Sequence, residues 1–176
     1  MTDSRTCKHC GETIAADGEA CPACGHLYGR VPCPDDAGRD APGQCVICAL
    51  PVCGRAPDAG RPYLCAPHQE IPVIEGWAQV YSTSTDLDAE LVQGNLQAEG
   101  IESRILSQKD HFFAPVTMGD LGPVRVLVPA YAYLDAHELI EAHTDRDGEV
   151  RFACAACGEP YEADARSCAS CGAAVR

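Results

Sequence analysis

Lysine is almost absent from this sequence of 176 residues, which contains only Lys8 and Lys109. Arginine does not make up the difference, because Lys and Arg together number 13 against 26 Asp and Glu, for a formal net charge of -13. Proteins that bind nucleic acids need clustered basic side chains to displace counterions from the phosphates. No basic stripe occurs anywhere in the chain. The charge therefore argues against nucleic acid as a partner.

The sequence also lacks any run of about 18 uninterrupted apolar residues, the length that a helix needs to cross a bilayer. Residues 1–7 contain no apolar signal region. These absences predict a cytoplasmic protein that has no membrane partner. In a reducing compartment, paired Cys-x-x-Cys motifs indicate metal ligation by thiolates before they indicate disulfides.

Cysteine is missing from the middle of the chain, because all 13 cysteines lie before residue 70 or after residue 150. Both ends are therefore rich in cysteine and poor in residues that form a core. Such short segments bury too little apolar surface to offset the loss of chain entropy, so a covalent or coordinative bond must hold them. A chain of this length forms one ordinary domain or several small ones, and this distribution predicts several.

The two ends of the chain carry an internal repeat. Each copy has a Cys-x-x-Cys-Gly motif, then a short spacer of equal length, then a second such motif. The cysteines are Cys7, Cys10, Cys21 and Cys24 in the first copy and Cys154, Cys157, Cys168 and Cys171 in the second. Zinc takes four ligands in a tetrahedron, and a Cys-x-x-Cys pair supplies two sulfurs from one tight turn. We predict one zinc ion in each copy, with disulfides between the pairs as the alternative.

A glycine directly follows each of these four cysteine pairs. The glycines are Gly11, Gly25, Gly158 and Gly172. Glycine permits the positive φ with which the chain curls and points its amides towards the sulfurs. A site closed by four thiolates leaves no position for water or substrate, so we expect both zinc ions to be structural.

A third cluster lies in residues 45–70, where Cys45, Cys48, Cys65 and His68 form a set of three cysteines and one histidine. We predict a third zinc ion there. Cys53 lies close enough in sequence to replace any of the four, and is otherwise expected to be a small buried side chain beside the metal. The stretch 30–44, dense in Pro, Gly and Asp, is predicted to be a linker. Its Cys33 is expected to be a free thiol on that linker, with a ligand or redox role as the alternative.

Ordinary secondary-structure periodicity occurs only between the cysteine-rich ends. Residues 77–82 and 101–105 are predicted strands, and residues 124–128 are a third. Thr85 with Asp88 fits a capping box and Gly100 a left-handed stop, so a helix built on Leu87, Leu91 and Leu96 lies between them. A second helix is predicted over 132–143, on Leu134, Leu139 and Ile140. The order predicts an α+β domain with an antiparallel sheet and helices on one face.

Through their paired Cys-x-x-Cys-Gly motifs, the two ends resemble the double zinc ribbon and zinc-ribbon families of small prokaryotic proteins. That resemblance implies structural or docking modules. The cluster at 45–70 looks loosely like a B-box or treble-clef finger because of its Cys-x-x-Cys and Cys-x-x-His ends.

The central segment resembles the DUF2007 family of prokaryotic signal-transducing proteins, on residues 80–84, 89–92, 96–101 and 124–129. The resemblance implies a small ferredoxin-like or PII-like β-α-β-β-α domain with a regulatory role, and it supplies no catalytic residues. The sequence departs from the family in a long loop at 109–122. Phe112 and Phe113 in that loop are expected to close the small core, with a binding lip as the alternative.

The resulting domain plan has five segments. They are a zinc ribbon at 1–29, a linker at 30–44, a zinc-finger-like module at 45–70, a DUF2007-like domain at 77–145 and a second zinc ribbon at 150–176. The apolar residues on the ribbon flanks lead us to predict that the two ribbons pack against each other. These residues are Ile14, Leu27 and Tyr28 in the first ribbon and Phe152 and Tyr161 in the second.

No nucleophile with a base, paired carboxylates or phosphate-binding glycine loop is visible in the sequence. We therefore expect a non-enzymatic, zinc-binding adaptor or signal-transducing protein that binds a protein partner. One alternative is a thiol redox protein that uses its Cys-x-x-Cys pairs, although such pairs normally stand alone at a helix N-terminus. A second alternative is a zinc ribbon that binds nucleic acid. The sequence leaves the identity of the partner and the oligomeric state open.

Overall fold

The computed structural model describes residues 4–34, 36–107, 123–144, 152–154, 156–157, 159–161 and 165–175. The chain forms two compact units. The first unit contains Met1–Ala78 and Pro129–Leu134, and the second contains Gln79–Val128 and Asp135–Arg176. Phe112, Phe113 and Gly158 lie outside the described residues. Among the described residues, no helix is long and apolar enough to cross a membrane.

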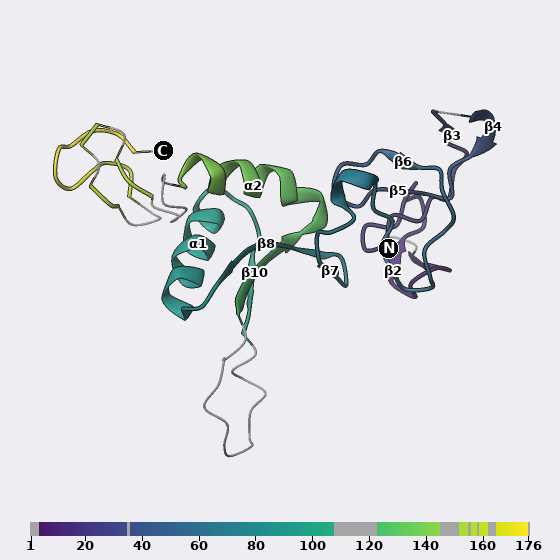
Figure 1. Cartoon of the computed structure of the whole chain (residues 1–176), viewed down its shortest axis with the longest axis horizontal. Coiled ribbons are helices and arrows are strands. Elements are labelled where there is room, and N and C mark those ends of the chain that lie inside the picture. Colours follow the sequence, from purple (N-terminus) through teal and green to yellow (C-terminus); the bar gives the residue numbers. More distant parts are fainter. Residues whose placement is uncertain are drawn as a thin grey trace, which may run out of the picture. The chain divides into compact units, whose positions relative to one another are not determined.

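Among the elements of the first unit are three short antiparallel hairpins and a turn of 3-10 helix (Figure 1). β1 (Ser4–Thr6) pairs with β2 (Thr13–Ala15), β3 (Pro32–Cys33) with β4 (Asp36–Asp40), and β5 (Gly43–Gln44) with β6 (Pro51–Val52). The helical turn η1 spans Ala66–His68. Isolated two-stranded hairpins of this size are marginally stable at best. Contacts between the hairpins and through the cysteines must therefore stabilise the unit.

The segment 30–44 differs from the linker that its composition predicts. It forms the β3–β4 hairpin and the start of the next hairpin, and Arg30 pairs with Asp40 at an Nε–Oδ2 distance of 2.8 Å. Cys33 is 2% exposed and packs with Leu27 and Ala41, so it is not a thiol on a flexible tether. Pro, Gly and Asp favour turns as strongly as they favour linkers, and here they form the bends of a hairpin.

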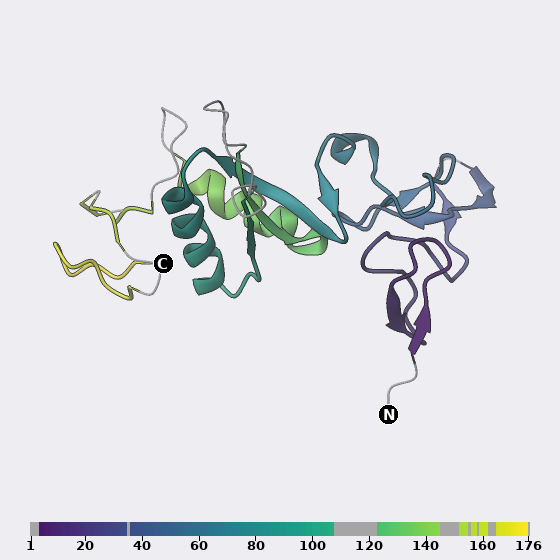
Figure 2. The same ribbon diagram turned by 90° about the horizontal axis from the view of Figure 1, so that it is seen from below.

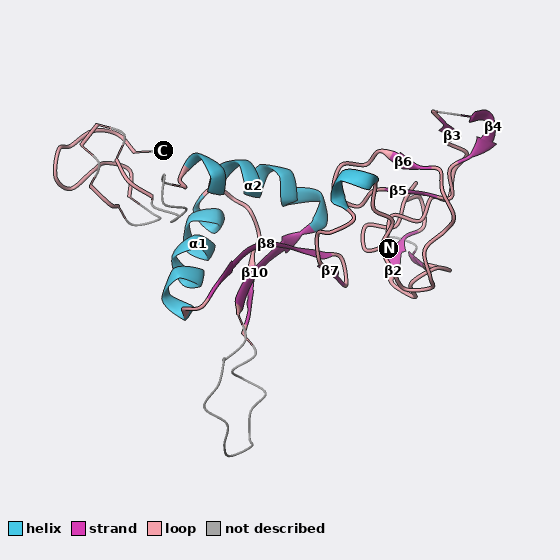
Figure 3. Cartoon of the chain, viewed as in Figure 1, coloured by secondary structure: helices cyan, strands magenta, loops and turns pink. Residues whose placement is uncertain are grey.

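The chain also forms a four-stranded antiparallel sheet with two helices (Figure 3). Its strands are β7 (Val73–Ile74), β8 (Trp77–Thr83), β9 (Arg104–Leu106) and β10 (Val124–Pro129), in the order β7-β8-β10-β9. The helices are α1 (Asp86–Ala98) and α2 (Tyr133–Ala142), and Figure 1 shows both on one face of the sheet. The predicted succession of strand, helix, strand, strand, helix is confirmed.

β7 is the one element of this sheet that the sequence analysis did not predict. A two-residue turn joins it to β8, and both turn residues, Glu75 and Gly76, have positive φ, at 50° and 82°. Turns of this kind match the twist of a hairpin. The Glu-Gly pair between two apolar dipeptides was the available signal.

The ends of α1 are those that the sequence predicts. The hydroxyl of Thr85 accepts a hydrogen bond from the backbone N–H of Asp88 at 3.2 Å, and Gly100 adopts a φ of 79°. The buried face of the helix is different, because Ala89, Val92 and Leu96 are buried.

Two of the three leucines expected to face the core of α1 are instead exposed, Leu87 by 75% and Leu91 by 41%. In α2, Ala136 and Ile140 are buried, whereas Leu134 is 46% exposed. Small alanines let a helix approach the sheet closely, so a pattern counted on large apolar residues selects the wrong face. The prediction of the core-facing residues was therefore wrong for Leu87, Leu91 and Leu134.

Candidate metal centres

All 13 cysteines lie among the described residues, and none forms a disulfide. The structure gathers most of them, with one histidine, into three groups that could hold a metal ion. The groups are Cys7, Cys10, Cys21 and Cys24; Cys45, Cys48, Cys65 and His68; and Cys154, Cys157, Cys168 and Cys171. Within each group, the four ligand atoms lie within 4.8 Å of one another. These are the three sets that the sequence spacing predicts.

In the first group, the two motifs face each other crosswise. The sulfurs of Cys7 and Cys24 are 3.7 Å apart, and those of Cys10 and Cys21 are also 3.7 Å apart. Zinc–sulfur bonds of about 2.3 Å in a tetrahedron place two sulfurs about 3.8 Å apart. A disulfide would bring them to about 2.05 Å. The spacing therefore fits a tetrahedral metal ion and not a disulfide.

The third group repeats this arrangement in the second unit. The sulfurs of Cys154 and Cys171 are 3.6 Å apart, as are those of Cys157 and Cys168. The first cysteine of the group thus lies beside the fourth, and the second beside the third, as in the first group. Exposure differs between the two copies, because Cys157 and Cys171 are exposed whereas three of the four cysteines in the first group are buried.

The second group uses one nitrogen ligand. Nδ1 of His68 lies 3.4 Å from the sulfur of Cys45 and 3.1 Å from that of Cys65, and the sulfurs of Cys48 and Cys65 are 3.6 Å apart. The helical turn η1 begins directly after Cys65 and ends at His68. The N–H of His68 donates to the carbonyl of Cys65 at 2.9 Å, which closes the turn. The turn therefore points both side chains at the same centre.

A turn of the same shape closes each Cys-x-x-Cys pair that the structure describes fully. The N–H of Gly11 donates to the carbonyl of Cys7 at 2.9 Å, and that of Gly25 donates to Cys21 at 2.7 Å. The φ values of Gly11, Gly25 and Gly172 are 83°, 79° and 72°, which confirms the predicted positive φ at these three positions.

Ala49 occupies the corresponding position after Cys48 in the second group. Its N–H donates to the carbonyl of Cys45 at 2.9 Å, and its φ is 58°. A residue with a Cβ pays for this left-handed conformation by roughly 1–2 kcal/mol. The geometry of the turn is thus imposed on a residue that does not favour it.

We expect Ala49→Gly to stabilise the protein by about 1 kcal/mol, because glycine adopts a positive φ without strain. Urea unfolding in the presence of zinc measures the change. Ala66→Gly is the matched control, since Ala66 also lies next to a ligand of the second group, at an exposed position with no positive φ. That control should be neutral or destabilising, and equal losses in both variants would contradict the prediction.

Hydrogen bonds prepare one thiol of the first group for metal binding. Burial acts to raise the pKa of Cys7, but the nearby Tyr28 hydroxyl and the backbone amides of Cys10 and His9 lower it to about 6. Burial raises the pKa of Cys24 in the same group. Four thiolates in one place repel one another, and a divalent cation at their centre removes that repulsion.

The second group shows the same contrast. Burial acts to raise the pKa of Cys45, but the backbone amides of Cys65, Cys48 and Ile47 lower it to about 6. Burial, followed by the neighbouring sulfurs of Cys48 and Cys45, raises the pKa of Cys65 to about 12. A metal ion that binds here must therefore displace a proton.

Aromatic side chains surround the first group, and the sequence analysis did not assign them this place. The guanidinium of Arg5 lies 3.7 Å above the centroid of the Tyr28 ring and donates to the carbonyl of Gly18. The rings of His9 and His26 stack at 5.9 Å, and the ring of Tyr63 lies 5.2 Å from that of His9. Both histidines lie outside the ligand set. An aromatic residue two positions before Cys65 was the available signal for Tyr63.

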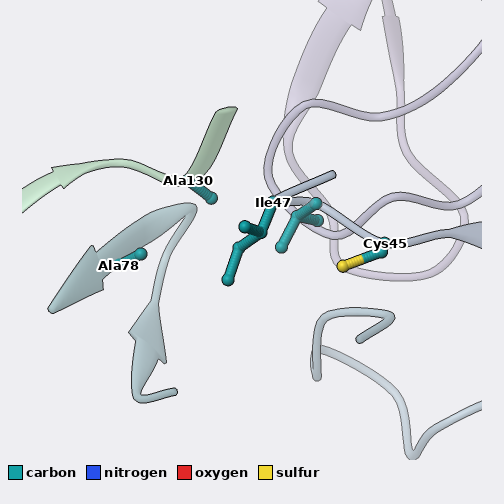
Figure 4. Close-up of a cluster of buried hydrophobic side chains, with 5 residues drawn as sticks. Cys45, Ile47, Ala78 and Ala130 are labelled. Carbon is teal, nitrogen blue, oxygen red and sulfur yellow. The ribbon is translucent and has the colours of Figure 1, made fainter. Parts of the chain in front are cut away.

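A small apolar cluster adjoins the second group within the first unit. Figure 4 shows Ile47, which lies between Cys45 and Cys48, pointing towards Ala78 and Ala130. Ala78 is fully buried and Ala130 is 1% exposed. The loop that carries two of the ligands is therefore held by the start of β8 and the residue after β10.

Cys53 is not part of the second group, although its position in the sequence made it a possible substitute ligand there. It packs against the cluster of Leu27, Cys33 and Ala41. The two cysteines outside the three metal groups, Cys33 and Cys53, thus share one apolar cluster. Cys53 is partly buried, as predicted, but its neighbours are those of the β3–β4 hairpin.

The apolar residues that led to the predicted pairing of the two ribbons make contacts inside their own units. Ile14 packs with the cysteines of the first group, and Leu27 packs with Cys33. In the second unit, the ring of Phe152 lies 4.5 Å from that of His143, and Tyr161 packs against the third group. Ile14, Leu27 and Phe152 are thus buried, and Tyr28 and Tyr161 are partly buried, while the packing of the two ribbons against each other stays a prediction.

Residues 77–144 match the DUF2007 family, described as "Putative prokaryotic signal transducing protein". The match spans β8 to α2, which is less than half of the chain, and confirms the resemblance seen in the central segment. All twelve residues of the three metal groups lie outside it. Searches of curated proteins and of solved structures gave no match.

Proposed function

We propose that this chain is a non-enzymatic, zinc-binding adaptor or signal-transducing protein whose structural zinc ions hold small modules that bind a protein partner. The observation that carries the proposal is the convergence of twelve ligand atoms into three closed sets of four. Sets of four thiolates, or three thiolates and one imidazole, in a tetrahedron are typical of structural zinc. A closed set offers no open position for a substrate, which supports a role without catalysis.

The first and third groups fit zinc ribbons. Each consists of two Cys-x-x-Cys turns whose sulfurs interleave, with short antiparallel bridges beside them, such as Ala20 to Leu27 and Ser167 to Ala174. The central sheet fits a ferredoxin-like domain, because β10 lies between β8 and β9 in an antiparallel sheet. In this chain β7, which precedes the domain, takes the place beside β8.

The family description of residues 77–144 supports a signalling role and hence a protein partner. The alternatives are less well supported. In a redox pair, the two thiols react with each other and have no further cysteine sulfur beside them. Here, each Cys-x-x-Cys pair has a sulfur that lies 3.6–3.7 Å from the sulfur of a cysteine outside the pair. A nucleic-acid-binding ribbon needs basic residues, and the chain has a net charge of -13.

We expect the purified full chain to bind three zinc ions. Native mass spectrometry counts metals and subunits together, and elemental analysis identifies the metal. Cys10→Ser, Cys48→Ser and Cys157→Ser should each remove one ion, and Cys33→Ser, outside the three groups, is the matched control that should remove none. Preparations without metal, or disulfides mapped between the pairs, would refute the proposal.

A further inference from the structure

The first two metal groups lie in the same unit and share a junction at Tyr63, which is 1% exposed. The N–H of Tyr63 donates to the carbonyl of Cys24 at 2.8 Å. The carbonyl of Tyr63 accepts from the N–H of Val46 at 3.1 Å. Cys24 belongs to the first group, and Val46 follows Cys45 of the second. One residue therefore joins the ligand loops of both groups through its backbone.

A second connection runs parallel to the first. The N–H of Gln44, directly before Cys45, donates to the carbonyl of Gly25, directly after Cys24, at 2.8 Å. Figures 1 and 2 show the first ribbon beside β5 and β6, the strands that flank this turn. The turn at Cys21–Cys24 of the first group and the turn at Cys45–Cys48 of the second group are thus connected at two points.

The other turn of the first group is held by the loop that leads to Tyr63. The N–H of Gly60 donates to the carbonyl of His9 at 3.0 Å, and Nε2 of His9 donates to the carbonyl of Arg61 at 2.9 Å. His9 lies between Cys7 and Cys10. Both turns of the first group therefore contact the segment that ends in Cys65, a ligand of the second group.

The Tyr63 ring fills the space at this junction. It lies directly on Gly43, where a Cβ would overlap three carbons of the ring. The centroid of the Tyr63 ring also lies 5.2 Å from that of His9, the residue that precedes Cys10 in the first turn. Buried aromatic rings contribute a large share of the stability of a small core.

We infer that Tyr63 couples the first two metal groups, so that zinc binding to either one raises the affinity of the other. This inference rests on the proposed zinc binding. Ordering the ligand loops costs conformational entropy, which metal binding must offset. The first ion to bind orders Tyr63 and both segments bonded to it, so the second ion meets loops that are already in place. Tyr63 is a positioning residue, since it contacts neither metal centre as a ligand.

The occupancy of single chains tests the coupling directly. The full chain carrying Cys157→Ser and Cys171→Ser keeps only the first two groups. At half saturation, two equal and independent sites leave about half of the molecules with one ion. Native mass spectrometry during a zinc titration should find singly loaded molecules well below that share. A statistical share would overturn the inference.

Reciprocity gives a second test. In the same background, Cys10→Ser should weaken cobalt binding to the second group about tenfold or more, and Cys48→Ser should weaken the first group by the same factor. Visible spectra of Co²⁺ separate the two, because a nitrogen ligand shifts the bands away from those of four thiolates. Unequal factors, or no change in the intact group, would overturn the inference.

Variants at the junction assign the coupling to Tyr63. Tyr63→Phe keeps the ring and should keep the shortage of singly loaded molecules. Tyr63→Leu and Gly43→Ala should raise the singly loaded share towards the statistical value while both groups still fill at excess metal. Gly54→Ala, where a Cβ meets nothing within 4 Å, is the matched control. Unchanged cooperativity in both junction variants would overturn the assignment.

Two failures remain distinguishable in these experiments. If the wild-type chain binds no metal, the proposed function fails and the inference falls with it. If both groups bind metal independently, the proposed function stands and only the coupling is refuted.

Discussion

Replacing Gly25 with alanine should destabilise the first unit by at least about 4 kcal/mol, whereas the same change at Gly11 should cost about 1–2 kcal/mol. Both glycines follow the second cysteine of a pair in the first ribbon, and their φ values are 79° and 83°. The two substitutions therefore carry the same strain from a positive φ.

The difference between the two positions lies in their surroundings. A Cβ on Gly25 would lie far inside contact distance of the Gln44 carbonyl oxygen, whereas a Cβ on Gly11 meets nothing within 4 Å. The oxygen belongs to the backbone next to Cys45, so it cannot move aside without displacing the second metal group. Urea unfolding of each zinc-loaded variant, followed by circular dichroism, measures the two costs. Similar losses in both variants would show that the contact with Gln44 adds nothing.

The second large effect concerns the third metal group, which should lose its metal first. Cys157 and Cys171 are exposed, whereas Cys7, Cys21 and Cys24 are each at most 2% exposed. Attack on a thiolate needs access to the sulfur. We expect a thiol-alkylating reagent to modify Cys157 and Cys171 at least about tenfold faster than the cysteines of the first group.

Peptide mass mapping of the zinc-loaded full chain over time measures these rates, and a coloured chelator reports zinc release in parallel. Cys154 and Cys168 provide the internal control, because they belong to the same group but are each 3% exposed. They should react only after their exposed partners. Modification of Cys7 before Cys157, or of all four cysteines of the third group together, would contradict the expected order.

Much of the candidate site could be predicted because its signals are local. The turn of a Cys-x-x-Cys-Gly motif is set within five residues, so the spacing of the cysteines and the positions of the glycines contain most of the information. The cap of α1 at Thr85 is local for the same reason, since its hydroxyl reaches only to Asp88. Whether the three groups bind zinc stays a prediction.

The features that could not be predicted depend on contacts between distant segments. Nothing near Tyr63 in the sequence shows that it bonds to Cys24 and to Val46. Ala49 adopts a positive φ because the second group needs the same turn as the others, against the preference of its side chain. The faces of α1 and α2 were partly misjudged because Ala89 and Ala136 are buried, whereas Leu87, Leu91 and Leu134 are exposed.

The strand β7 has a consequence for any attempt to isolate the domain that matches DUF2007. That match begins at residue 77, but Val73 and Ile74 pair with the start of β8, at Ala78 and Trp77. A fragment cut at residue 77 would leave the N–H and C=O groups along that stretch of β8 without their strand partner. Unpaired strand edges recruit other chains and lead to aggregation. The domain boundary drawn by family likeness therefore lies several residues inside the boundary drawn by backbone pairing.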